Sequence, residues 1–173
     1  MIRTALPFRT FLICLTLSVT PRAIAQHDMR FFVGHWDFSI WSTEDVSGAP
    51  AFTGEWFVED GLDSALALVD RVQLNDGPGV QGGTFTRELI AFDSHAGRYT
   101  RTIITNTGAS YSFTSSGWNG DELTWIGEQR SAAGIVKLRE VIVRTGPGSF
   151  TAVFHRKEGD VWVLQSNERL TRR

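Results

Sequence analysis

The stretch Phe31-Phe32-Val33-Gly34-His35-Trp36-Asp37-Phe38 decides the fold, because it opens the first strand-like segment of the chain. From Gly34 onward apolar and polar side chains alternate, with Trp36 and Phe38 on one side and Asp37 on the other. A period of two places apolar side chains on one face of a β-strand and polar ones on the opposite face. The segment is therefore predicted to be a half-buried strand whose aromatic residues face a core.

Further segments along the chain repeat this alternation, and turn residues separate them. They cover 52–59, 64–74, 84–93, 98–106, 110–116, 122–129, 135–144, 149–156 and 161–170. No stretch reads as a long amphipathic helix, and the connections are short enough for antiparallel neighbours. We expect an all-β protein: an antiparallel up-and-down lipocalin-like barrel of about 8–10 strands with a short N-terminal helical turn.

A meander with so many strands exposes two edges unless it closes on itself. Closure would bring the first strand beside the last one. A terminal arginine could then cover the Trp36 ring in a cation–π contact worth roughly 1–2 kcal/mol. The alternative is that Arg172 and Arg173 form a frayed tail.

Residues 1–25 have the features of a cleaved secretory signal. Arg3 and Arg9 give a basic start, an apolar run follows over 10–19, and Ala23-Ile24-Ala25 supplies small residues before the cleavage point. The apolar run is about half the ~20 residues of a spanning helix. The sequence therefore predicts export rather than stable membrane insertion.

The remaining chain, 26–173, is expected to form one barrel domain in the periplasm or outside the cell. Cys14 is the only cysteine and lies in the signal, so the mature domain does not depend on a thiol. Removal of the signal lowers Lys plus Arg from 17 to 14 against 19 Asp plus Glu, a net charge of about −5. This balance argues against nucleic acid as a partner, and the sequence does not define the oligomeric state.

Four short motifs resemble those of a known group of proteins. They are Phe32-x-Gly34-x-Trp36, Phe92-Asp93, Gly117-Trp118-Asn119-Gly120-Asp121-x-Leu123-Thr124-Trp125-x-Gly127 and Leu170-Thr171-Arg172. In these the chain resembles the secreted bacterial lipocalin-like β-barrels of unknown function. The resemblance implies a calycin-type barrel with an internal cavity, and that family brings no agreed activity or catalytic residues.

The opening motif is also distantly similar to that of the haem-binding nitrobindin-type barrels. Those proteins hold iron through a histidine on a strand near the C-terminus, whereas 161–170 contains none. His155 lies one strand earlier and falls on the face opposite the aromatic residues. No cofactor, haem included, is therefore expected.

The histidines do not form a recognisable metal motif. His35 and Asp37 share a strand face, which permits the start of a two-ligand site, but a solvated polar face is the favoured interpretation. No nucleophile elbow, phosphate-binding loop or dinucleotide fingerprint is present, because the glycines serve turns. No metal site is predicted.

Four charged residues fall on the apolar register of their strands: Asp70, Arg87, Arg101 and Glu140. Buried charges are costly unless paired, so they would form an internal network or contact a polar ligand group. Arg87 or Arg101 could hold a ligand carboxylate, and Asp70 or Glu140 would be the best general acid or base. A bulge that shifts the register would instead turn these side chains outward.

The favoured function is a non-catalytic binding module for a small hydrophobic or amphipathic ligand. The expected lining residues are Trp36, Phe38, Trp56, Leu66, Leu68, Phe85, Arg87, Tyr99, Arg101, Phe113, Trp125 and Trp162. One alternative is an isomerase, cyclase or decarboxylase that uses the four charged residues on an aromatic or lipid acid. Others are a structural domain with a filled barrel, or partner binding through an exposed patch around Trp118 and Trp41.

Overall fold

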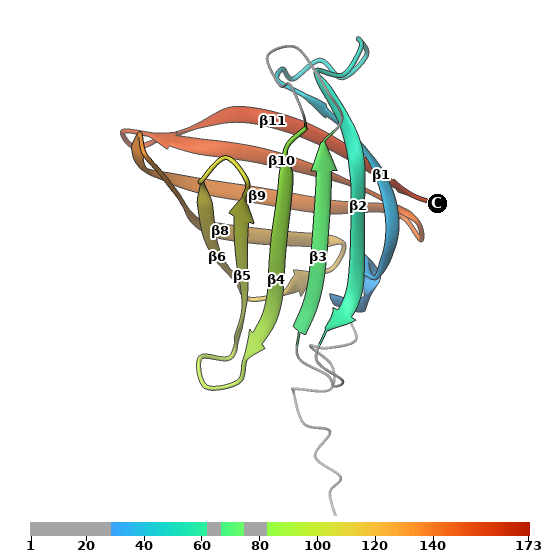
Figure 1. Cartoon of the computed structure of the whole chain (residues 1–173), viewed down its shortest axis with the longest axis vertical. Coiled ribbons are helices and arrows are strands. Elements are labelled where there is room, and N and C mark those ends of the chain that lie inside the picture. The colour runs from blue at the N-terminus through green and yellow to red at the C-terminus, as the bar shows by residue number, and fades with distance from the viewer. Residues whose placement is uncertain (1–28, 62–66, 75–82) are drawn as a thin grey trace, which may run out of the picture.

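The computed structural model describes residues 29–61, 67–74 and 83–173 (Figure 1). The predicted signal sequence and Leu66 lie outside these ranges. The elements are η1 (Arg30–Phe32), β1 (Gly34–Trp41), β2 (Phe52–Gly61), β3 (Ala67–Leu74), β4 (Phe85–Asp93), β5 (Arg98–Thr105), β6 (Ser110–Ser115), β7 (Trp118–Asn119), β8 (Glu122–Ser131), β9 (Gly134–Gly146), β10 (Ser149–Glu158) and β11 (Val161–Arg172). Within the described ranges, no helical segment has the length and apolar composition needed to cross a bilayer.

All strands belong to one antiparallel sheet that follows an up-and-down order. Consecutive strands pair with each other except β6 and β7, because β6 pairs with β8 past the two-residue β7. The first strand, β1, pairs with the last, β11. The sheet curls strongly, so that β2 to β5 run across the direction of β9 to β11 (Figure 1). The predicted all-β fold, the antiparallel topology and the helical turn are confirmed, and the shape is compatible with a lipocalin-like barrel.

The turn between β4 and β5 shows how local chemistry sets the connections. The Asp93 carboxylate accepts hydrogen bonds from the backbone N–H groups of His95 at 2.9 Å and Ala96 at 3.0 Å. Gly97 then adopts a positive φ of 64°, which a residue with a side chain rarely takes. These features fix a short hairpin at the position that the sequence predicts.

An aromatic plug closes one end of the barrel. The helical turn η1 places Phe32 against Trp36, whose indole N–H donates to the Phe32 carbonyl at 2.7 Å, and against Trp56 and Phe150. Trp36 is completely buried. The sequence predicts Trp36 as a cavity-lining residue, but its ring is held in this plug and is not part of the cavity lining.

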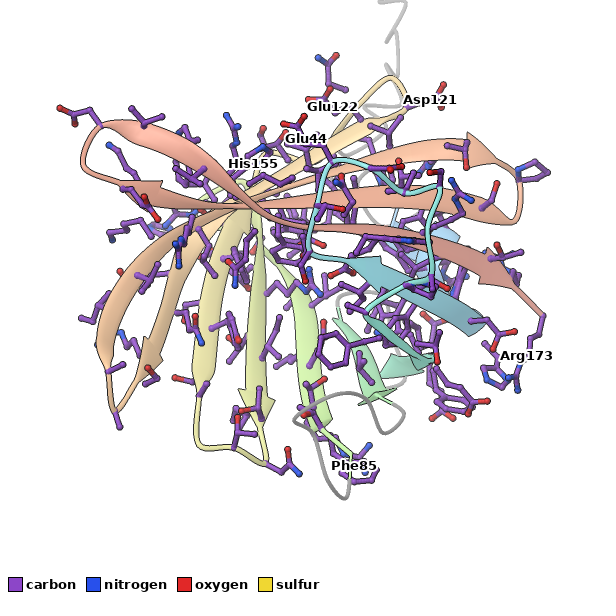
Figure 2. The ribbon with its side chains drawn as sticks, turned by 90° about the horizontal axis from the view of Figure 1, so that it is seen from above. Glu44, Phe85, Asp121, Glu122, His155 and Arg173 are labelled. Atoms are coloured by element: carbon purple, nitrogen blue, oxygen red, sulfur yellow. The ribbon has the colours of Figure 1, made fainter. Side chains whose placement is uncertain are left out.

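The predicted arginine lid is also present. The Arg172 guanidinium carbon lies 4.5 Å from the Trp36 ring centre, and the side chain donates to the Phe31 carbonyl. Gly34 has a φ of 138°, and a Cβ there would lie 3.5 Å from Arg172 Nε, so the strand begins under the lid. Arg173, which Figure 2 shows at the end of the chain, pairs with Asp37 at 2.6 Å. The alternative of a frayed tail is wrong.

The β6–β8 contact depends on one glycine. Gly127 on β8 lies opposite Phe113 on β6, and a Cβ on Gly127 would approach the Ser112 carbonyl oxygen to 2.0 Å and Phe113 Cα to 2.8 Å. Both atoms belong to the backbone, so neither can move aside easily. Gly127 is therefore required for the close approach that joins these strands.

Two strands differ from the expected register. In β4 the side chains of Glu88 and Ile90 are buried. Phe85 is 42% exposed (Figure 2), and Arg87 is exposed as well. The predicted inward orientation of Phe85 and Arg87 is therefore wrong. The strand has apolar residues on both faces, and its pairing with β5 selects the face that carries Ile90.

In β11 a bulge reverses the side-chain faces. Phe154 pairs with Ser166 and His155 with Leu164, which leaves Gln165 as an extra residue. Trp162 consequently packs against Arg139 on the outer face, with the guanidinium carbon 5.1 Å from its ring centre. Its predicted place in the cavity wall is wrong because one extra residue turns the following side chains over.

Candidate functional site

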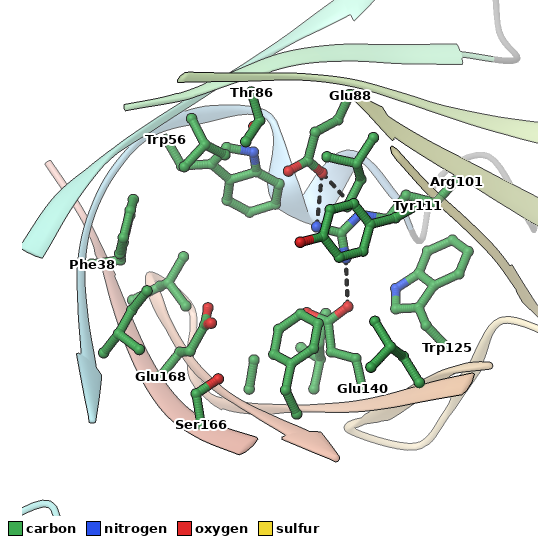
Figure 3. Close-up of a pocket in the computed structure, with 18 of the residues that line it drawn as sticks. Phe38, Trp56, Thr86, Glu88, Arg101, Tyr111, Trp125, Glu140, Ser166 and Glu168 are labelled. Atoms are coloured by element: carbon green, nitrogen blue, oxygen red, sulfur yellow. Dashed lines mark hydrogen bonds and ion pairs between the residues drawn. The ribbon is translucent and has the colours of Figure 1, made fainter. Parts of the chain in front are cut away.

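A cavity of about 260 Å³ occupies the barrel interior (Figure 3). Phe32, Trp56 and Phe150 belong both to its lining and to the aromatic plug, so they form its floor. Its volume is slightly below the roughly 300–1,000 Å³ common for small-molecule sites, so it suits a small ligand. The interior is not packed solid.

Several expected lining residues do face this cavity. They are Phe38, Trp56, Arg101 and Trp125, together with the predicted acid Glu140. Leu68, Tyr99 and Phe113 are buried in the surrounding core, at 5%, 4% and 2% exposure. The sequence thus identified inward-facing residues on most strands, although only part of them reaches the cavity.

A buried ion cluster spans the cavity wall. Arg101 on β5 donates through Nε to Glu88 Oε2 at 2.8 Å, and its Nη2 lies 2.7 Å from the same oxygen. Its Nη1 donates to Glu140 Oε2 at 2.5 Å. The side chains of Arg101, Glu88 and Glu140 are 9%, 4% and 4% exposed. The guanidinium therefore joins β4, β5 and β9 with charge-assisted hydrogen bonds.

A third carboxylate, Glu168 on β11, points into the cavity from the opposite wall (Figure 3). It pairs across the sheet with Ile40 on β1 and Ala152 on β10, so apolar residues flank it. The carboxylate of Glu168 accepts a hydrogen bond from the Ser166 side chain. Its side chain is half-buried and lines the cavity.

Burial in the cavity wall shifts Glu140 and Glu168 toward their neutral forms. Burial raises the pKa of Glu140 to about 7, and Glu88 adds to this, while Arg101 acts against it. Burial and then the charge of Glu140 raise the pKa of Glu168 to about 8. Burial and Glu88 also raise the pKa of Tyr111. Both carboxyls can therefore exchange a proton near neutral pH.

The structure brings two of the four predicted charged residues together. Arg101 and Glu140 form the cluster, whereas Arg87 faces outward, and the side chain of Asp70 on β3 lies outside the described part. Sequence reasoning missed Glu88 and Glu168. Glu168 lies two residues before the apolar Leu170 and so shares its strand face. The rule that identified Glu140, a charged residue within an apolar row, would therefore have identified Glu168 as well.

Two buried polar atoms of lining residues lack a hydrogen-bond partner. They are the indole nitrogen of Trp56, a residue only 5% exposed, and the Thr86 hydroxyl. In Figure 3 both residues lie beside Glu88. An unsatisfied buried polar group costs about 1–3 kcal/mol. A polar group of a ligand inside the cavity would remove this cost.

The cavity does not fit haem. Among the described lining residues there is no histidine, cysteine or methionine to bind the iron. Tyr111 lines the cavity, but its raised pKa disfavours the phenolate that would bind iron. His155 pairs with Arg139 on the outer face of the sheet, as the sequence predicts.

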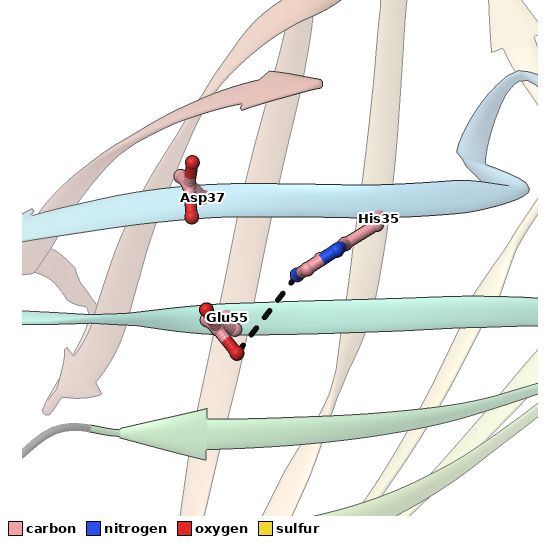
Figure 4. Close-up of side chains that lie close together, drawn as sticks. All are labelled: His35, Asp37 and Glu55. Carbon is pink, nitrogen blue, oxygen red and sulfur yellow. Dashed lines mark ion pairs between the residues drawn. The ribbon is translucent and has the colours of Figure 1, made fainter. Parts of the chain in front are cut away.

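His35, Asp37 and Glu55 lie together outside the cavity, with ligand atoms within 4.8 Å of one another (Figure 4). His35 and Asp37 are the pair that the sequence places on one face of β1, and Glu55 comes from the neighbouring strand β2. However, Arg173 already contacts both acids, at 2.6 Å from Asp37 and 2.5 Å from Glu55. A metal ion would have to displace this guanidinium, so the arrangement favours the polar-face interpretation.

The two tryptophans considered for a partner surface are covered. Trp41 is 8% exposed and donates to the Gly48 carbonyl at 2.9 Å. Trp118 is half-buried beneath Arg144, whose guanidinium carbon lies 3.6 Å from its ring centre. The expectation of an exposed patch around them is wrong, because hydrogen bonding and cation–π stacking hold both rings against the barrel.

A comparison with models of protein families finds no match, and a comparison with curated proteins finds no significant similarity.

Proposed function

We propose that this protein binds a small amphipathic molecule inside its barrel. The observation that carries the proposal is an interior of about 260 Å³ that is walled by aromatic and aliphatic side chains and holds a few converging polar groups. Apolar walls supply affinity through burial, and a few fixed polar groups supply orientation and specificity. The orphaned Thr86 hydroxyl supports the same conclusion, because a polar group of a ligand would satisfy it.

Intrinsic fluorescence tests this proposal, since Trp56 and Trp125 line the cavity. The protein is titrated with fatty acids, phenolics, aromatic amines and tetrapyrroles that fit a cavity of this size or exceed it. We expect a saturable change with a small amphipathic compound. Substitution Trp125→Phe should reduce the change, whereas Trp41→Phe, which alters a ring held against Gly48, should not. Absence of a saturable change with every compound would contradict the proposal.

A second candidate is catalysis of proton transfer, which one observation favours. Glu140 and Glu168 have pKa values of about 7 and 8, close to the range that suits a general acid or base. A substrate carboxylate would have to compete with Glu88 and Glu140 for Arg101, which disfavours the aromatic or lipid acids expected from the sequence. Exchange of ligand protons with D₂O, lost in Glu140→Gln, would support catalysis over simple binding.

We also propose that the chain is exported and belongs to the secreted lipocalin-like barrels. The basic start, the apolar run and the Ala23-Ile24-Ala25 sequence support export, and the four motifs together with the curled sheet support the family. Mass spectrometry of the protein from cell fractions tests the first part. We expect a mature chain that begins at Gln26 outside the cytoplasm, and a full-length cytoplasmic chain would contradict it.

A further inference from the structure

The charges around the cavity identify the kind of ligand, provided that the proposed binding function is correct. We infer that the cavity selects a small organic cation, a primary amine on an aromatic or branched apolar body, with its ammonium group facing Glu168. This assigns both the charge and the approximate size of the ligand.

The cavity wall carries more acidic than basic side chains. Three carboxyl side chains line the cavity, those of Glu88, Glu140 and Glu168. Arg101 is the only basic residue among the described lining residues. A bound anion would therefore face an excess of acids, whereas a bound cation would balance them.

Arg101 is already paired with two carboxylates of the cavity wall. Its Nε and Nη2 face Glu88, and its Nη1 faces Glu140. A ligand carboxylate would have to break these buried contacts and leave a buried charge without its partner, which is strongly unfavourable. The guanidinium is a fixed part of the wall rather than a site for an anion.

Glu168 lines the cavity away from this ion cluster. Figure 3 shows its carboxylate across the cavity from the Glu88–Arg101 pair, with Phe38 and Trp56 on the adjacent walls. An ammonium group placed there meets a carboxylate on one side and aromatic rings on the other. Desolvated cation–π contacts with these rings add to the attraction of the carboxylate. Apolar and aromatic walls exclude a strongly hydrated metal ion and fit an organic amine.

Binding of such a cation is coupled to loss of a proton. Without a ligand, Glu168 holds a proton in neutral solution because burial and Glu140 raise its pKa to about 8. The titratable and charged groups that face it are Glu88, Arg101, Glu140 and Tyr111, while its strand neighbours Ile40 and Ala152 are apolar. An ammonium ion favours the ionised carboxylate, so one proton leaves Glu168 for solvent as the amine binds.

Three probes of similar shape test the inference: phenethylamine, phenethyl alcohol and 3-phenylpropionate, which are cationic, neutral and anionic. Calorimetric titrations of the purified mature protein at pH 6, 7 and 8 give the affinities. We expect the amine to bind about tenfold or more tightly than the other two at pH 8. Its affinity should rise by up to about tenfold per pH unit from pH 6 to 8, as Glu168 ionises. At pH 6, well below the pKa of about 8, buffers of different ionisation enthalpy should report release of one proton.

Two glutamine variants complete the test. Glu168→Gln should remove the preference for the amine and its pH dependence while the alcohol still binds. Glu158→Gln, which changes an exposed acid paired with Arg156, should behave as the wild type. Equal or tighter binding of the alcohol or the anion would overturn the inference but preserve the binding function. Saturable binding of none of the three probes at any pH would overturn both.

Discussion

Replacement of Glu168 by glutamine should make the stability of the barrel less sensitive to pH. The pKa of Glu168 is raised from 4.5 to about 8 in the folded protein. Between these values the folded state holds a proton that the unfolded state releases, so the wild type loses stability as the pH rises. One such group changes the free energy of unfolding by about 1.4 kcal/mol per pH unit.

The structure sets the size of the effect. From pH 5 to pH 8 Glu168 lowers the stability of the wild type by roughly 4 kcal/mol, and Glu140, with a pKa of about 7, lowers it further up to pH 7. Glutamine keeps the shape of the side chain and cannot ionise. Relative to the wild type, the variant should therefore gain roughly 4 kcal/mol between pH 5 and pH 8.

Urea denaturation followed by tryptophan fluorescence at pH 5, 6, 7 and 8 measures this change. The exposed control Glu158→Gln should retain the pH dependence of the wild type. If the stability of the wild type is constant or increases from pH 5 to 8, or if Glu168→Gln leaves the slope unchanged, Glu168 is not held in its neutral form and the electrostatic account of the cavity is wrong.

Three further substitutions test other parts of the structure, each by urea denaturation at constant pH. Arg101→Met should destabilise the fold by about 3–5 kcal/mol at pH 8. The loss should be smaller at pH 5, where Glu140, with a pKa of about 7, is protonated and needs no charged partner; an equal loss at both pH values would contradict the buried ion cluster. Gly127→Ala should lower the free energy of unfolding by about 1–3 kcal/mol or more, because a Cβ meets the β6 backbone. Gly48→Ala should lower it much less, because nothing lies within 4 Å of a Cβ there. Equal effects would refute the close approach of β6 and β8. Arg172→Ala should cost roughly 1–2 kcal/mol through loss of the lid on Trp36, and a loss no greater than that of the exposed Arg156→Ala would count against the lid.

Much of the fold was predictable because alternation defines strands directly. The segment around Trp36 and Phe38 shows one apolar and one polar face, and its predicted start at Gly34 is the start of β1. Closure of the meander then predicted that the first and last strands pair. The observed pairing of Trp36 with Arg172 follows from that argument.

The errors arose where alternation does not choose a face. In β4 Phe85 and Leu89 lie outward while Ile90 is buried, so both faces of the strand carry apolar residues. Only pairing with β5, which places Glu88 beside Ile103, decides the register, and that is a tertiary contact. Arg87 was therefore assigned to the interior in place of Glu88.

The candidate site was predicted in part for the same reason. Arg101 and Glu140 interrupt clear apolar rows, and both are buried in the cluster. Trp162 was misplaced because the extra residue Gln165 reverses the faces within β11, and a single-residue bulge leaves no distinct sequence pattern. The cavity itself depends on how side chains from many strands fill the interior, which local pattern does not specify.

The most direct test of the account is to fill the cavity. Ala152 on β10 is buried, lines the cavity and lies opposite Glu168 across the sheet, so Ala152→Leu places apolar volume where the ligand is proposed to bind. The binding of phenethylamine to this variant is measured by calorimetry, together with its thermal unfolding. The account predicts loss of binding with a melting temperature equal to or above that of the wild type. Undiminished binding by a stably folded variant would show that the ligand site lies elsewhere and would contradict the account.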